Sequence, residues 1–146
     1  MGLSKNHLSS NREAVCFEPE RLGLLLQQRV PEAVFCLLMG SAAGGVVAPG
    51  SDLDLAFFLR SKPTLDFFQR VAGATAEMLP EVRCDAGILN SAEPVYRFEA
   101  LKGRLLFVHD RVGYAAFYSL TCREYESQMA SYERQRLYRQ EARHAV

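Results

Sequence analysis

Residues 40–55 read GSAAGGVVAPGSDLDL: a glycine-serine pair, a loop of small residues, and two aspartates one residue apart. An apolar run over 33–39 precedes the pair, and a second apolar run carries the aspartates. Residues i and i+2 of a strand point to the same face, so Asp52 and Asp54 should project together. Like charges held side by side repel each other, which indicates that a cation is expected at this place.

The remaining pattern predicts an α+β fold. Apolar periodicity and flanking prolines and glycines predict helices over 17–30, 62–80 and 91–103 and strands over 33–39, 51–59, 81–89 and 104–110, followed by helix from about residue 111. This order is typical of helices packed on a small mixed β-sheet. In the helix over 62–80 we expect one apolar face made by Leu65, Phe68, Ala72, Ala76 and Leu79.

Length and composition restrict the function. We expect 146 residues to form a single domain over 1–146, with an N-terminal extension over about 1–16 and a C-terminal helical segment over about 111–146. The 17 basic and 17 acidic residues balance, which argues against binding to bulk nucleic acid. No apolar stretch is long enough for a membrane span, and the four cysteines form no CxxC pair. A cytoplasmic protein with reduced thiols is expected.

A third acidic residue, Asp85, lies in the strand predicted over 81–89. If that strand neighbours the one over 51–59, three carboxylates converge. Oxygen-rich sites of this kind suit Mg²⁺, and two such ions can hold the attacking and leaving oxygens of a phosphoryl displacement. Gly40 lets a phosphate approach the backbone closely, and Ser41 offers a hydroxyl. The sequence therefore predicts a magnesium and phosphate site made from these five residues: Gly40, Ser41, Asp52, Asp54 and Asp85.

The glycine-serine pair, ten intervening residues and the Asp-x-Asp motif resemble those of the DNA polymerase beta nucleotidyltransferase superfamily. More narrowly, the chain is similar to the minimal nucleotidyltransferases (MNT domains) that accompany HEPN toxins. The similarity extends through VRCDAGILN (82–90) and RFEALKGRLLFVHD (97–110) to the C-terminal helix. It implies the nucleotidyltransferase fold.

The resemblance also implies roles for the residues. Asp52 and Asp54 would bind two Mg²⁺ ions, and Asp85 would complete the catalytic metal site and help to activate the incoming hydroxyl. Gly40 and Ser41 would hold the β and γ phosphates of ATP. Family members paired with HEPN toxins transfer AMP from ATP to a toxin tyrosine, so a HEPN-type toxin is the expected partner and acceptor.

One departure from the family concerns charge. The family usually reads GS-[RY]-A-R-G, whereas this chain has Ala42 and Gly44 where basic residues are usual. The phosphate charge would then rest on metal, on backbone amides and on a basic residue from elsewhere, such as Arg60 or Lys62.

Other interpretations stay open. Asp52 could be a turn residue after Pro49-Gly50, and Asp85 could face solvent on an edge strand. The whole chain could be a binding module that neutralises its partner by contact without chemistry. It could also be a transferase for a small molecule such as an aminoglycoside, which would need a further acceptor-binding domain or a dimer. Whether the chain forms a homo-oligomer is left open.

The segment after residue 111 holds five of the six tyrosines. Steps of four and seven place Tyr114, Tyr118, Tyr125 and Tyr132 near one helical face, which favours a core-facing stripe over a partner surface. Four arginines at 134, 136, 139 and 143 follow, with few apolar residues among them. Such a helix end either frays or meets an acidic partner.

Overall fold

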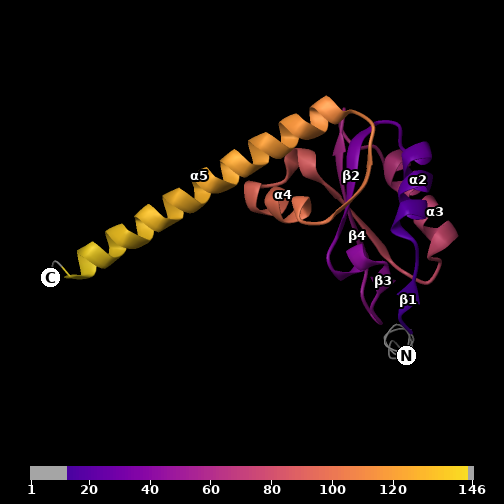
Figure 1. Cartoon of the computed structure of the whole chain (residues 1–146), viewed down its shortest axis with the longest axis horizontal. Helices are drawn as coiled ribbons and strands as arrows, with labels where there is room; N and C mark the ends of the chain where they lie inside the picture. The colour runs from indigo at the N-terminus through magenta and orange to yellow at the C-terminus, as the bar shows by residue number, and fades with distance from the viewer. Residues whose placement is uncertain (1–12, 145–146) are drawn as a thin grey trace.

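The computed structural model describes residues 13–144 and arranges them around a mixed four-stranded sheet (Figure 1). The first twelve residues of the expected N-terminal extension and the last two residues of the chain lie outside the described residues. The strands are β1 (Val15–Cys16), β2 (Ala33–Met39), β3 (Val46–Val47), β4 (Leu53–Leu59), β5 (Cys84–Ile88) and β6 (Arg104–Val108). The helices are α2 (Pro19–Arg29), α3 (Leu65–Met78), α4 (Pro94–Leu101) and α5 (Arg111–His144), with 3₁₀ turns η1 (Ser41–Gly44) and η2 (Leu89–Ser91).

The strand order of the main sheet is β5-β4-β2-β6. β2 runs antiparallel to both of its neighbours, and β4 runs parallel to β5. The last residues of β2 therefore lie beside the first residues of β4 and β6, with the start of β5 next to β4. Four separate segments of the sequence thus meet at one end of the sheet, and the expected α+β fold with a small mixed sheet is confirmed.

Two apolar clusters cover the two faces of this sheet. Leu53, Leu55 and Phe57 pack with residues of α2 and α3, whereas Phe35 and Ala56 pack with Ala100 of α4 and Phe117 of α5. β2 is buried along nearly its whole length, which explains why its sequence is continuously apolar rather than alternating. The alternation of β4 assigns its odd-numbered residues to the α2–α3 face and its even-numbered residues to the α4–α5 face.

The apolar face expected for the helix over 62–80 is confirmed at Leu79 and, half-buried, at Phe68, and it is wrong at Leu65, Ala72 and Ala76, which are exposed. The buried residues of α3 are Phe67, Val71, Ala74 and Thr75, while Leu65 is 74% exposed. Phe67 decides the orientation because its ring meets Phe57 of β4 edge to face, with centroids 5.1 Å apart.

A short ribbon between β1 and β3 was not expected from the sequence. Val15 pairs with Val47, and the N–H of Phe17 donates to the carbonyl of Gly45 over 2.9 Å. Gly45 has φ +93°, and a Cβ there would stand 2.9 Å from the Phe17 carbonyl oxygen, so only glycine suits this position. The ribbon anchors the segment that follows η1.

Helix α5 runs far beyond the rest of the molecule (Figure 1). Tyr114 packs against Phe35 and Tyr125 stacks on Phe98, as a core-facing stripe requires. Tyr118 and Tyr132 are 46% and 51% exposed, so the expectation of a buried stripe is wrong for them. Helix α5 extends away from the sheet before the tyrosine stripe ends. Within residues 13–144, no helix has the length and apolar character that crossing a membrane requires.

Two helical glycines provide a matched stability test. A Cβ at Gly23 in α2 would stand 2.6 Å from the Leu106 carbonyl oxygen, whereas a Cβ at Gly73 in α3 meets nothing within 4 Å. We expect Gly23→Ala to lower the free energy of unfolding by about 1–3 kcal/mol because backbone must move. Gly73→Ala should raise it by about 0.5–1 kcal/mol because alanine favours the helix. Urea unfolding measures both; changes of the same sign would contradict the packing of α2 on β6.

Candidate active site

Two of the three predicted carboxylates lie side by side at the end of the sheet. Asp54 of β4 is in register with Asp85 of β5 on one side and with Met39 of β2 on the other. Neighbouring strands are about 4.8 Å apart, and residues in register present their side chains on the same face. Asp54 and Asp85 therefore share the α4–α5 face of the sheet. β5 is an edge strand and Asp85 is exposed, as the solvent-facing alternative expected, and it also lies beside a second acid.

Asp52 precedes β4 and is exposed. Its position two residues before Asp54 favours the same face of the sheet, and its negative charge contributes to the raised pKa of Asp54. The pKa of Asp54 is raised, mainly by burial and then by the charges of Asp85 and Asp52. The same three carboxylates add to the effect of burial on Cys84, whose pKa rises to about 11. The three acids thus form one electrostatic group, in which negative charge accumulates.

The glycine-serine turn faces this group. Gly40 adopts φ 71° and ψ −162°, a conformation available essentially to glycine alone, and η1 begins at the next residue. A Cβ at Gly40 would lie 3.9 Å from Oδ2 of Asp54, so the Asp54 carboxylate approaches the turn directly. Ser41 is exposed and is the first residue of η1; the cap position belongs to Gly40. The structure therefore places the turn beside Asp54, and the role of the five residues as one site stays a prediction.

A cavity of about 430 Å³ opens between the turn and α4. Gly40 and Asp54 line it from the sheet, and Glu99, Lys102 and Gly103 line it from the end of α4 and the approach to β6. Sequence reasoning did not select these last three residues. Their signal was the Lys-Gly pair between a predicted helix and a predicted strand, because such a junction returns to the same end of the sheet as the turn.

Tyr96 of α4 lies over the same face beside the acids. Its hydroxyl is 2.4 Å from the position that a Cβ would take at Gly87, two residues beyond Asp85. Burial and the charges of Asp85 and Asp54 raise the Tyr96 pKa. A side chain at position 87 would therefore displace the Tyr96 hydroxyl, which lies close to Asp85 and Asp54.

The donor chemistry fits Mg²⁺, which prefers carboxylate and phosphate oxygens. Among residues 13–144, however, no three His, Cys, Asp or Glu side chains are arranged so that they could hold a metal ion by themselves. Magnesium is normally bound in proteins by one or two carboxylates, with waters and substrate phosphates filling its remaining positions. The acid group therefore fits an ion that arrives with a phosphorylated substrate, and not a closed structural metal site.

The basic residues that sequence reasoning offered for phosphate are at the wrong end of β4. Arg60 and Lys62 follow the last residue of the strand, whereas Asp54 lies at its start. Seven strand residues separate the two ends by roughly 20 Å. The Arg60 guanidinium instead donates to the Pro31 carbonyl over 2.7 Å. That expectation is wrong, because it ignored the direction in which β4 runs.

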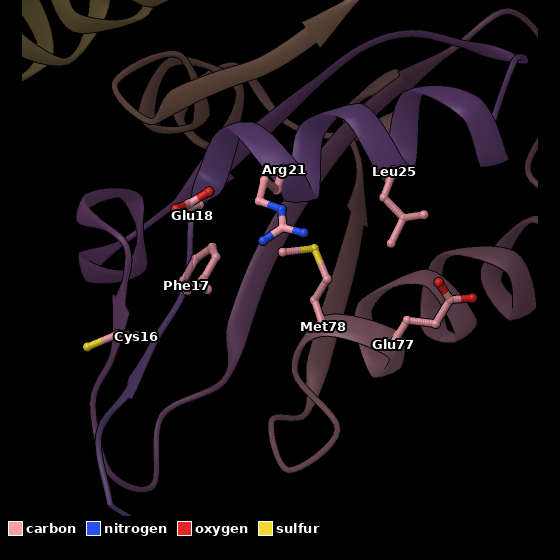
Figure 2. Close-up of a pocket in the computed structure, with 7 residues that line it drawn as sticks. All are labelled: Cys16, Phe17, Glu18, Arg21, Leu25, Glu77 and Met78. Atoms are coloured by element: carbon pink, nitrogen blue, oxygen red, sulfur yellow. The ribbon is translucent and has the colours of Figure 1, made fainter.

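A larger cavity, of about 700 Å³, lies on the other side of the sheet. Figure 2 shows Arg21 and Leu25 of α2 pointing toward Glu77 and Met78 of α3 across it. Cys16, Phe17 and Glu18 complete its lining. None of the five predicted site residues lines it, so we assign the candidate active site to the smaller cavity.

The family model for polymerase beta nucleotidyltransferases matches residues 21–112, which is more than half of the chain. The chain therefore belongs to this nucleotidyltransferase family. The matched segment runs from α2 to the start of α5 and contains the glycine-serine turn and all three aspartates. No curated protein sequence matches the chain significantly.

Solved structures with the same fold include several toxin–antitoxin complexes. One is a MntA toxin–antitoxin mutant in which two aspartates one residue apart are replaced by glutamate; it has 20% identity and a TM-score of 0.65, covering 85% of this chain and 98% of that chain. A toxin–antitoxin structure with AMP-PNP has 22% identity and a TM-score of 0.64, with the same coverage. A complex of tri-AMPylated HEPN toxin with MNT antitoxin from Shewanella oneidensis has 20% identity and a TM-score of 0.58, covering 84% and 93%.

The turn itself can be tested with two glycines of one segment. Gly40→Ala should lower the free energy of unfolding by about 1–3 kcal/mol, because alanine is strained at φ 71°. Gly44→Ala is the control, since a Cβ there meets nothing within 4 Å and the residue has no positive φ. Its effect should stay within about 0.5 kcal/mol. Equal losses for the two variants in urea unfolding would show that the turn is not held as described.

Proposed function

We propose that the chain is a metal-dependent nucleotidyltransferase that transfers AMP from ATP to a tyrosine of a HEPN-type toxin and so acts as the antitoxin. The observation that carries the proposal is the register of Asp54 beside Asp85, facing the turn at Gly40. Family membership supports nucleotidyl transfer. The AMP-PNP and tri-AMPylated toxin complexes among the solved relatives support ATP as substrate and the toxin as acceptor.

The residues divide the reaction between them. Asp52 and Asp54, with Asp85 on the catalytic side, would hold Mg²⁺, which when bound neutralises phosphate charge and stabilises the leaving pyrophosphate. Gly40 and Ser41 hold the β and γ phosphates against the backbone of the turn. Asp85, beside the open edge of the sheet, accepts the proton of the tyrosine hydroxyl as its oxygen attacks the α-phosphate. An ester bond to AMP forms as the bond to pyrophosphate breaks.

The cysteines and the net charge bear on the cellular compartment and on the class of partner. The four cysteines are free thiols, with Cys36 buried and Cys16 exposed, which supports a reducing compartment such as the cytoplasm. A balanced charge supports a partner other than bulk nucleic acid.

Transfer of label from α-labelled ATP tests the proposal. The chain is co-purified with the product of the adjacent gene, incubated with ATP and Mg²⁺, and analysed by gel and intact mass. Asp54→Asn should abolish transfer, and Asp85→Asn should slow it by about 100-fold or more because proton acceptance is lost. Arg60→Ala, at the far end of β4, is the control and should transfer label at the normal rate. Undiminished transfer by Asp54→Asn would refute the assignment.

A second candidate function is supported by the missing basic residues at 42 and 44. In that case the chain neutralises its partner by contact alone. The Asp52→Ala/Asp54→Ala double variant would then still bind the partner and protect cells from it, and the wild-type chain would add no mass to the partner. Loss of protection in the double variant, with binding retained, favours the enzyme.

A further inference from the structure

The candidate cavity combines concentrated negative charge with one cation. Among the described residues that line it, Lys102 is the one basic side chain, and Asp54 and Glu99 are the acids. A nucleoside triphosphate would bring several more negative charges to this place. Its phosphates therefore need a cation that the glycine-serine turn does not supply, because the turn carries Ala42 and Gly44.

The backbone holds Lys102 next to the turn. Lys102 caps the end of α4, Gly103 follows, and β6 begins at Arg104. A Cβ at Gly103 would stand 2.5 Å from the Leu38 carbonyl oxygen, so the chain passes close against the end of β2, two residues before Gly40. This close approach requires glycine at 103 and fixes the preceding lysine at the mouth of the cavity.

The ammonium group of Lys102 can exchange its ion-pair partner. It pairs with Glu99 at 2.9 Å and lies 5.1 Å from the ring centroid of Phe98, which stacks on Tyr125 of α5. The side chains of Lys102 and Glu99 are 58% and 51% exposed. An ion pair this exposed contributes little to stability, so a phosphate group can replace Glu99 as the partner.

The neighbouring cation, Arg104, lies outside the cavity lining. The Arg104 guanidinium pairs with Glu20 of α2 and donates to the Ala43 carbonyl over 3.4 Å. Arg104 thus ties η1 to α2 and β6 from outside the cavity lining. Because Arg104 does not line the cavity, Lys102 is the cation among the described lining residues that can meet the substrate.

We infer that Lys102 binds the β and γ phosphates of the nucleotide substrate, exchanging its ion pair with Glu99 for the triphosphate. This inference rests on the proposed function and assigns its phosphate-binding cation. The cationic contact comes from the α4–β6 junction and not from the turn itself. The recognition is of charge and of phosphate oxygens, and it is independent of the base.

Calorimetry with Mg²⁺-ATP on the full chain tests the inference. Lys102→Ala should weaken binding by about 10-fold or more, as the loss of a hydrogen bond to a charged group does. Lys102→Arg should keep binding near the wild-type value. Glu99→Gln should tighten it by roughly 2–5-fold because the competing carboxylate is removed. Lys62→Ala, an exposed lysine at the far end of β4, is the matched control and should bind like wild type.

Probes that lack parts of ATP locate the contact. Tripolyphosphate with Mg²⁺ should lose affinity for Lys102→Ala by the same factor as ATP, whereas adenosine should bind both proteins equally. Adding Gly44→Arg to Lys102→Ala should raise the affinity roughly threefold or more above that of Lys102→Ala alone. The space around Gly44 is open, and the arginine returns a cation to the turn. Ala42 is buried, so position 42 does not offer the same rescue.

The outcomes separate the two claims. If wild-type chain binds neither Mg²⁺-ATP nor tripolyphosphate, the proposed function and the inference both fall. If wild type binds and Lys102→Ala binds equally well, the inference is wrong and the proposed function stands. Equal weakening by Lys102→Ala and Lys62→Ala would reveal a general charge effect and would also overturn the inference. Thermal unfolding of each variant confirms that affinity, and not folding, has changed.

Discussion

The candidate site depends on two like charges that are held in register on adjacent strands. Asp54 and Asp85 cannot move apart without unpairing β4 from β5, and both lie at the end where β2 gives way to a glycine turn. Desolvation at this spot, and then repulsion by Asp85 and Asp52, disfavour the ionised state of Asp54 and raise its pKa. The fold tolerates this local cost because the core beneath is apolar on both faces of the sheet. A cation bound with substrate would relieve it.

Strand direction explains which parts of the site sequence reasoning could reach. Asp54 and its motif partner are close in sequence, so alternation alone indicates a shared face. Asp85 needed one further assumption, that two strands separated by a helix are neighbours, and a strand–helix–strand unit usually satisfies it. The choice of Arg60 failed because a strand is extended. Arg60 is only six residues from Asp54 in the sequence, but it lies at the opposite end of the sheet.

Lys102 was missed for a different reason. It lies about sixty residues after the turn, and its proximity arises from β6 pairing with β2, a non-local contact that no short motif reveals. The elements themselves were easier to predict, since each main-sheet strand is a short apolar or alternating run and each of the three shorter helices begins with a proline or a capping threonine. The orientation of α3 was harder to predict, because Phe67 and Leu65 differ little in hydrophobicity. The aromatic contact of Phe67 with Phe57 distinguishes them.

The long helix α5 has a consequence for how the molecule opens locally. Its buried side chains, Phe117 and Thr121, both belong to the part that packs on the body. Helix nucleation is unfavourable, so the distal turns are seeded by the packed part and persist as its continuation. Hydrogen-exchange protection should therefore decline steadily toward His144, and the distal amides should record local fraying while those of β2 record global unfolding.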